Sequence, residues 1–171
     1  KYKVSYSFDG DNLNAKSSGS KTVTIEKADA ISLKNIVSAA SSLKTYYEKN
    51  KKFPNTVTAG GISFTIPEFL YLMSQAISQI DSSDTKDIAY LKGVTAPSSP
   101  SGDDISADLK LANYVKTAKS VSTYISSNKK APNYASSTAG KIIYSEVVDA
   151  FSRVLTFYDS NDRLPGYVTV I

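Results

Sequence analysis

Three stretches of the chain place asparagine, a basic residue and proline at the same spacing. The pattern Asn-x-x-x-Pro-Asn occupies residues 50–55 and 128–133, and a version ending in glycine occupies residues 161–166. Amide and cationic side chains donate hydrogen bonds to hydroxyl and carboxylate groups, so these boxes are candidate binding sites for an anionic polymer. The candidate ligand-binding residues are Asn50, Lys52, Pro54, Asn55, Asn128, Lys130, Pro132, Asn133, Tyr134, Asn161, Arg163, Pro165 and Tyr167.

The same boxes also have the composition of a helix end. Asparagine tolerates the left-handed conformation at a helix C-terminus, a basic residue complements the helix dipole, and proline prevents the helix from continuing. For the second asparagine, Asn55 or Asn133, a turn role and a ligand hydrogen bond are equal alternatives. The basic residues are also explained as solvated charges at helix ends.

Catalytic chemistry is narrowed by composition. The chain contains no Cys and no His, which excludes thiol nucleophiles, imidazole bases and nearly all zinc sites. A glycan hydrolase with two carboxylates remains, and Glu68 and Glu146 are the pair at matching positions. Both are predicted in the first turn of a helix, where capping explains them. We therefore expect no catalysis, no cofactor and no metal site.

Length and charge limit the partners. The 171 residues, 41% of them hydrophobic, are enough for one core. The net charge is +4 and the basic residues are spread along the chain, whereas a nucleic-acid binder is expected to show a dense basic stripe. No stretch approaches the roughly 18 apolar residues that span a bilayer, so neither nucleic-acid binding nor membrane insertion is expected. The chain begins in mid-strand pattern, as a piece of something longer would.

The N-terminal segment predicts a β-hairpin. Apolar and polar residues alternate over residues 2–8, residues 9–19 are rich in turn formers, and residues 22–25 predict a second strand. Asp9, Asp11 and Asn12 are read as a plain turn, because their spacing does not fit a calcium loop. Together the two strands resemble the closing strands of an immunoglobulin-like domain, which we assign to residues 1–28.

The helical period begins at residue 31. Apolar residues three or four apart predict a helix from the N-cap Ser32 to about Asn50. Residues 56–58 and 62–65 predict a hairpin, and the capping-box pair Thr65 and Glu68 opens a second helix through Ile80. Residues 81–108 are irregular, with a short helix predicted at 86–91.

This pattern then recurs. A shift of 78 positions lays residues 31–80 on 109–158 without a gap, and 14 of the 50 pairs are identical. A third copy starts inside the second, because Asn161 lies 33 positions beyond Asn128, so the helix that closes one unit opens the next. Repeats of this size pack their apolar faces on one another. The predicted fold is α+β and mainly helical, with repeated helix–turn–β-hairpin–helix units in one domain and an N-terminal β-hairpin.

Four runs in these repeats resemble the pseudomurein-binding repeat of archaeal adhesin-like cell-surface proteins. The runs are YYEKNKKFPN (46–55), GISFTIPEFLYL (61–72), NKKAPNY (128–134) and FSRVLTFYDSNDRLPGYVTV (151–170). Three residues depart from the family pattern: Thr56 stands for Tyr, Ser145 for Pro and Gly166 for the last Asn. The copies are therefore not expected to bind equally.

The resemblance implies a pseudomurein-binding domain at residues 29–171, with repeats at about 31–80, 109–158 and 147–171. It implies a non-catalytic module that anchors a surface protein to the pseudomurein wall of a methanogenic archaeon, in an extracellular, cell-wall-associated place. The ligand is either the glycan, whose disaccharides carry a carboxylate, or the peptide cross-link. The alternative is a structural spacer of an adhesin with no wall binding of its own.

Overall fold

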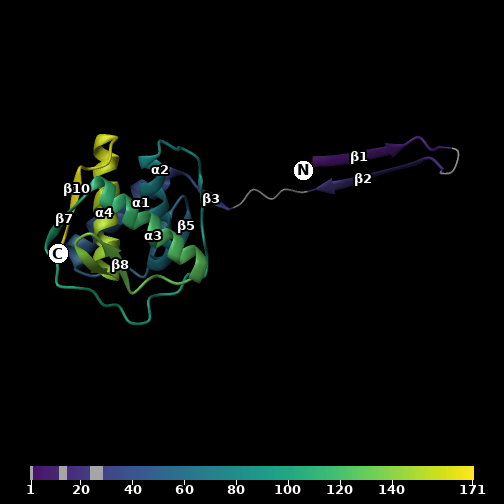
Figure 1. Cartoon of the computed structure of the whole chain (residues 1–171). Coiled ribbons are helices and arrows are strands. Elements are labelled where there is room, and N and C mark those ends of the chain that lie inside the picture. Colours follow the sequence, from purple (N-terminus) through teal and green to yellow (C-terminus); the bar gives the residue numbers. More distant parts are fainter. Residues whose placement is uncertain (1, 12–14, 24–28) are drawn as a thin grey trace.

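A computed structural model describes residues 2–11, 15–23 and 29–171. In this part of the chain, four helices form a body, and antiparallel strand pairs lie at its rim (Figure 1). The helices are α1 (Leu33–Asn50), α2 (Ile66–Asp81), α3 (Leu111–Asn128) and α4 (Tyr144–Asn161). The predicted α+β, mainly helical class with an N-terminal hairpin is confirmed.

The N-terminal hairpin pairs β1 (Tyr2–Phe8) with β2 (Ser17–Val23) in antiparallel register, from Tyr2 opposite Val23 to Phe8 opposite Ser17. The second strand therefore begins earlier than predicted, because backbone pairing with β1 carries it through serine and glycine positions that show no apolar alternation. Of the predicted second strand, residues 24–25 lie outside the described residues, and so does Asn12 of the predicted turn. The exposed aromatic side chains of β1 are Tyr6 and Phe8.

The first half of the helical body follows local signals closely. Ser32 caps α1, and its hydroxyl accepts the backbone N–H of Asn35 at 3.3 Å. Strands β4 (Thr56–Ala59) and β5 (Ile62–Thr65) form the expected hairpin. At the start of α2, the Thr65 hydroxyl accepts from the Glu68 N–H while the Glu68 carboxylate accepts from the Thr65 N–H, which is the predicted capping box.

The second half has the same order of elements. The first helix runs from Leu33 in one half and from Leu111 in the other, which is 78 residues later, and strands β8 (Tyr134–Ser137) and β9 (Gly140–Ile143) are displaced from β4 and β5 by the same number. The caps differ, because α3 and α4 start at Lys110 and Ile143 without a side-chain capping bond.

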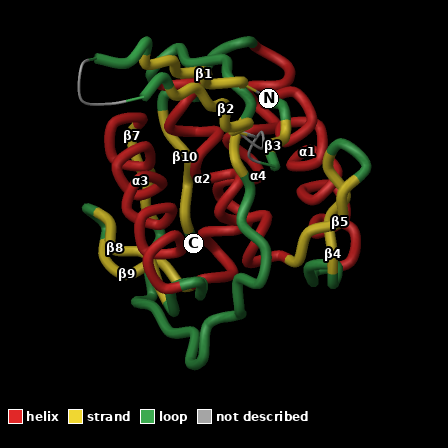
Figure 2. Tube along the Cα trace, turned by 90° about the vertical axis from the view of Figure 1, so that its right-hand side faces the viewer, coloured by secondary structure: helices red, strands yellow, loops and turns green. Residues whose placement is uncertain are grey.

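The helices pack across the two halves. Helix α1 lies against α4 and α2 lies against α3, so the first helix of each half contacts the second helix of the other. Figure 2 shows the helices in the centre, with the pairs β4–β5 and β8–β9 on opposite sides. Burial of each large apolar side chain contributes about 1.5–3 kcal/mol, so each half stabilises the other. Fully buried residues of this shared core include Ile36, Leu43, Phe69, Leu70, Met73, Tyr114, Ile125 and Leu155.

Two further strand pairs join distant parts of the chain. Strand β3 (Ala30–Ile31) pairs with β6 (Ile88–Ala89), and β7 (Ala107–Lys110) pairs with β10 (Tyr167–Val170). The predicted short helix at 86–91 is wrong, since β6 occupies its centre and buries Ile88 against the core. The reason is that the apolar residue satisfies a strand partner that is far away in sequence.

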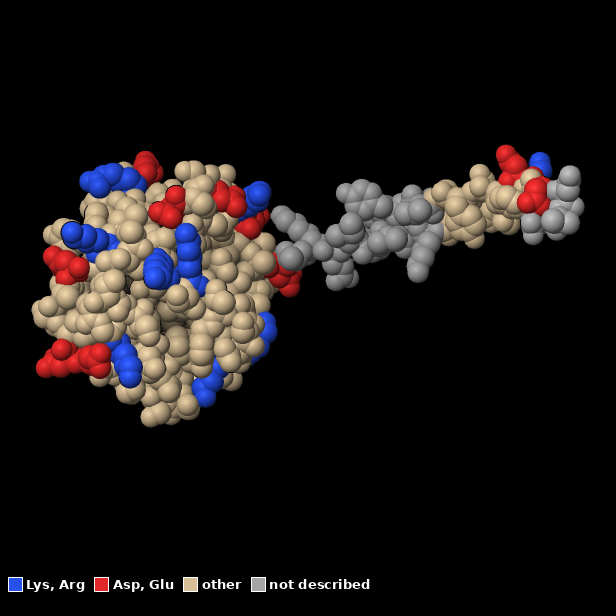
Figure 3. Space-filling view, viewed as in Figure 1, with Lys and Arg blue, Asp and Glu red and all other residues tan. Residues whose placement is uncertain are grey.

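The charged side chains of the helical body are dispersed. On the face in Figure 3, lysine and arginine are scattered among acidic residues. No helix among the described residues is long and apolar enough to cross a membrane.

Candidate functional site

Each box ends its helix in the same way. The box asparagine is the last helical residue, and its side-chain Nδ2 donates to the carbonyl oxygen four residues earlier at 2.8 Å: Asn50 to Tyr46, Asn128 to Tyr124 and Asn161 to Phe157. The next residue is the left-handed one, with φ of 54° at Lys51, 51° at Lys129 and 52° at Asp162. The expectation that the asparagine itself adopts this conformation is therefore wrong. It caps the helix with its side-chain amide instead.

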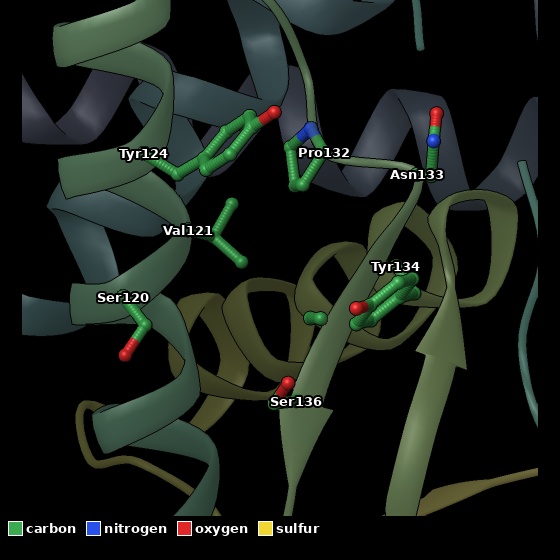
Figure 4. Close-up of a pocket in the computed structure, with 8 residues that line it drawn as sticks. Ser120, Val121, Tyr124, Pro132, Asn133, Tyr134 and Ser136 are labelled. Carbon is green, nitrogen blue, oxygen red and sulfur yellow. The ribbon is translucent and has the colours of Figure 1, made fainter. Parts of the chain in front are cut away.

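The chain that leaves a box forms one wall of a groove. After α3, the groove lies between this helix and β8, and Figure 4 shows Val121 and Tyr124 projecting from α3 toward Pro132 and the strand that carries Tyr134. After α4, a groove of the same kind lies between this helix and β10. The α3/β8 groove is lined by Ser120, Val121, Tyr124, Pro132, Asn133, Tyr134, Ala135 and Ser136. The α4/β10 groove is lined by Arg153, Val154, Phe157, Arg163, Pro165, Gly166, Tyr167, Val168 and Thr169.

These two linings correspond at an offset of 33 residues. Each residue of the α3/β8 groove has a counterpart in the α4/β10 groove, from Ser120 with Arg153 to Ser136 with Thr169. Each groove has an aromatic residue on its helix wall and a tyrosine on its strand wall, above an apolar floor of valine and proline. Such a mixture of apolar surface and a few polar groups is typical of ligand sites.

The tyrosines of these walls are unusually exposed. Within residues 29–171, the exposed large hydrophobic side chains are Ile171 and four tyrosines. Tyr124, Tyr134 and Tyr167 line the two grooves and are 43%, 36% and 58% exposed, and Tyr46 is the counterpart of Tyr124 on α1. Exposed tyrosines gathered in this way indicate a recognition surface.

A cation lies over one aromatic ring in each groove. The Lys141 Nζ is 4.9 Å from the Tyr134 ring centroid, and the Arg163 guanidinium carbon is 5.1 Å from the Phe157 ring centroid. Both distances are within the range of cation–π attraction. The rings therefore hold positive charge beside the grooves.

The first box is built differently. Phe53 turns inward and stacks on Tyr47 with ring centroids 4.3 Å apart, and Thr56 replaces the strand-wall tyrosine. A hollow beside this box is lined by α1 residues, including Tyr46 and Asn50. Lys52, Pro54 and Asn55 do not line that hollow.

The linker between the halves runs beside the second box. Thr95 donates its N–H to the Lys129 carbonyl at 3.0 Å and accepts from the Ala131 N–H at 2.9 Å. The Ser99 N–H donates to the side-chain Oδ1 of Asn133 at 3.0 Å. The Asn133 side chain thus holds the linker while its residue lines the groove, and no such bond is present at Asn55.

The two glutamates also bind backbone. The Glu68 carboxylate accepts the N–H groups of Thr65 and Gly93 at 2.9 and 2.8 Å. Burial opposes its ionisation, but these donors and the Lys92 ammonium outweigh burial and lower the pKa of Glu68. Glu146 does not form a capping box, so that part of the expectation is wrong. It accepts instead from Arg153 Nη2 at 3.1 Å and from the Ile171 N–H at 3.3 Å.

Glu146 belongs to an ionic cluster that holds β10 on α4. Arg153 Nε donates to the Asp149 carboxylate at 2.8 Å, and its Nη2 donates to the Thr169 carbonyl at 2.8 Å as well as to Glu146. Burial and the neighbouring Asp149 carboxylate raise the pKa of Glu146. Arg153 therefore fixes one wall of the α4/β10 groove to the other.

The boxes were only half of the grooves. Of the predicted residues, Pro132, Asn133, Tyr134, Arg163, Pro165 and Tyr167 line the grooves, whereas Asn128, Lys130 and Asn161 do not. The helix walls, with Ser120, Tyr124, Arg153 and Phe157, were missed. Their signal was present, because Val121 with Val154 and Tyr124 with Phe157 recur at the same offset as the boxes.

Residues 138–170 match the family model of the pseudomurein-binding repeat. This segment contains the whole lining of the α4/β10 groove, whereas the α3/β8 groove precedes it. The pseudomurein-binding repeat is a wall-binding family and not a known catalytic one, which indicates a cell-wall-binding module. A comparison with curated proteins finds no match for the chain.

Proposed function

We propose that this chain is a non-catalytic module that anchors a surface protein to the pseudomurein wall of a methanogenic archaeon, outside the cell. The observation that carries the proposal is the α4/β10 groove, since all of its lining residues fall inside the segment that matches the pseudomurein-binding repeat. Its exposed Tyr167 and the Arg163 guanidinium suit a ligand that combines sugar rings with negative charge.

The α3/β8 groove serves as a second site in this proposal. It has the same walls and floor at positions 33 residues earlier. Two sites on one rigid body raise the overall affinity for a polymer, because the second binding event is intramolecular. The matched segment and the one before it thus act together on neighbouring parts of the wall.

The proposed architecture is a pair of related units in residues 29–171, with copies at about 31–80 and 109–158 and a third at 147–171. Support comes from element bounds that recur after 78 residues and from the reciprocal packing of α1 on α4 and α2 on α3. Residues 1–28 are proposed to be the end of an immunoglobulin-like domain of an adhesin-like protein, on the strength of their strand pattern.

The predicted site residues divide by role in this proposal. Tyr134, Tyr167 and Arg163 touch the ligand, and Pro132 and Pro165 shape the floor. The helix-ending Asn50, Asn128 and Asn161 position the walls, because their side-chain amides are used in capping. The first box, with Lys52, Pro54 and Asn55, contributes less because Thr56 offers no aromatic wall.

The test is retention of the full chain on purified pseudomurein sacculi, with bacterial murein sacculi as the control. We expect the chain to sediment with pseudomurein and to stay in solution with murein. Equal retention on both would contradict wall specificity. Retention on neither would overturn the proposal and favour the spacer alternative.

A second measurement addresses catalysis on the same material. Glu68 and Glu146 are both bound to backbone N–H groups, so we expect no soluble sugar or peptide to be released during long incubation with sacculi. Release that is abolished by Glu146→Gln would show a hydrolase.

A further inference from the structure

The two grooves differ in charge at equivalent positions. Ser120 of the α3/β8 groove corresponds to Arg153, and the lining of the α3/β8 groove has no charged side chain, whereas two guanidinium groups line the α4/β10 groove. We infer that the α4/β10 groove binds the carboxylate of an acidic sugar through Arg163, beside the ring platform of Tyr167. This inference rests on the proposed wall binding and specifies which part of the wall this groove recognises.

Arg163 is the arginine that is free to bind an anion. Arg153 is committed to Asp149, Glu146 and the Thr169 carbonyl, with distances of 2.8, 3.1 and 2.8 Å. Among the described residues, Arg163 forms no ion pair and lies exposed over the Phe157 ring. Its guanidinium fork therefore has donors left for a carboxylate, which it can bind with two parallel hydrogen bonds.

The Phe157 ring prepares this contact. Stacking on an aromatic face restricts the long arginine side chain before a ligand arrives, so less conformational entropy is lost on binding. The counterpart of Phe157 in the other groove is Tyr124, and that of Arg163 is Lys130, which does not line its groove. The pairing of a stacked guanidinium with a groove is thus specific to α4/β10.

The remaining walls suit a sugar better than an extended peptide. Tyr167 is 58% exposed and offers a flat ring on which the C–H face of a pyranose can stack. Gly166 leaves the neighbouring corner open, since a Cβ there would meet no atom within 4 Å, whereas Asn133 fills the corresponding corner of the other groove. The groove thus has room for a ring that carries its carboxylate toward Arg163.

The experiment compares wild type with Arg163→Gln on two substrates, untreated pseudomurein sacculi and sacculi whose carboxylates have been amidated with a carbodiimide and ammonia. Lys34→Gln is the control, because it removes one exposed positive charge from α1, away from both grooves. Loss of a charge-assisted contact is expected to weaken binding about tenfold. We expect this loss for Arg163→Gln on untreated sacculi and no loss for Lys34→Gln.

Amidation should act on the same contact. Wild type should lose about tenfold on amidated sacculi, and Arg163→Gln should lose nothing further, because effects through one shared contact do not add. Arg163→Lys keeps the charge without the fork and should bind between the two. Thermal midpoints of all variants should equal that of wild type, since Arg163 is exposed.

Competition with soluble pieces of the wall identifies the source of the carboxylate. Peptide-free glycan strands should displace wild type, and amidated strands should displace it poorly. Displacement by cross-link peptides alone would overturn the assignment to a sugar. Wild type that fails to bind untreated sacculi contradicts the proposed function itself, whereas equal binding by wild type and Arg163→Gln contradicts this inference alone.

Discussion

The two halves of the helical body solve the same structural problem with different chemistry. In the first half, Gln75 on α2 donates to the Tyr71 hydroxyl at 3.2 Å. At the positions 78 residues later, Arg153 forms an ion pair with Asp149. The neutral pair lies in a half whose box lacks a strand-wall tyrosine, whereas the ionic pair supports the α4/β10 groove.

This difference separates what the fold requires from what the grooves add. Both halves need the second helix to hold the strand that follows it, and a carboxylate at Glu68 or Glu146 does so by accepting a backbone N–H from Gly93 or Ile171. The second half adds Arg153, which also binds the Thr169 carbonyl of β10. Cationic and aromatic residues are thus additions to a shared framework.

The largest effect is expected from breaking the ionic pair. Arg153→Gln places the first-half residue in the second half and leaves Asp149 and Glu146 partly buried without their cation, so we expect a loss of about 2–3 kcal/mol in the free energy of unfolding. Urea denaturation at neutral pH measures it. The double exchange Asp149→Tyr with Arg153→Gln restores a neutral pair and should recover part of that loss, and a double variant that is less stable than the single one would contradict this comparison.

The two glutamates should respond oppositely to pH. The lowered pKa of Glu68 means that its stabilisation is present above its ordinary pKa and is lost as pH falls through the folded-state value. The raised pKa of Glu146 means that stability declines as pH rises from its ordinary pKa through the folded-state value. At neutral pH we expect Glu68→Gln to cost about 1–2 kcal/mol and Glu146→Gln to cost less.

Urea denaturation of both variants between about pH 4 and about pH 8 tests this opposition. The stability of Glu68→Gln should fall less than that of wild type on acidification, and the stability of Glu146→Gln should fall less on alkalinisation. Parallel curves for the two variants would show that the glutamates are equivalent after all.

The strand-wall tyrosines should carry binding and not stability. Tyr134→Ala removes an exposed ring, so we expect about a tenfold loss of affinity for pseudomurein sacculi, corresponding to about 1.4 kcal/mol, with an unchanged thermal midpoint. The converse change, Thr56→Tyr, gives the first half the missing wall and should increase retention. A Tyr134→Ala variant with full affinity would assign binding to the helix walls or to other surfaces.

The smallest effect is expected at the second asparagine of the boxes. Asn133→Ala removes the acceptor of the Ser99 N–H and should cost about 0.5–1.5 kcal/mol in unfolding free energy. Asn55→Ala removes no bond of this kind and should be neutral in urea denaturation. Equal costs at the two positions would mean that both act as turn residues.

Predictability followed the distance between interacting residues. The Ser32 cap, the Thr65–Glu68 capping box and the β4–β5 hairpin depend on residues within a few positions of one another, and all three were predicted. The strand at Ile88–Ala89 was predicted as a helix, because its partner at Ala30–Ile31 lies far away in the chain. The site followed the same division, with the boxes predicted and the helix walls missed.

The amino-acid sequence by itself determined where the helices stop, how the hairpins turn and that the pattern recurs, since capping, proline geometry and apolar period act over a few residues. Tertiary structure alone decided which side chains meet: Tyr124 facing the strand of Tyr134, Arg163 over Phe157, and the Asn133 side chain holding the linker at Ser99. Those contacts depend on how helices and returning strands pack, and packing joins residues whose proximity no local signal specifies.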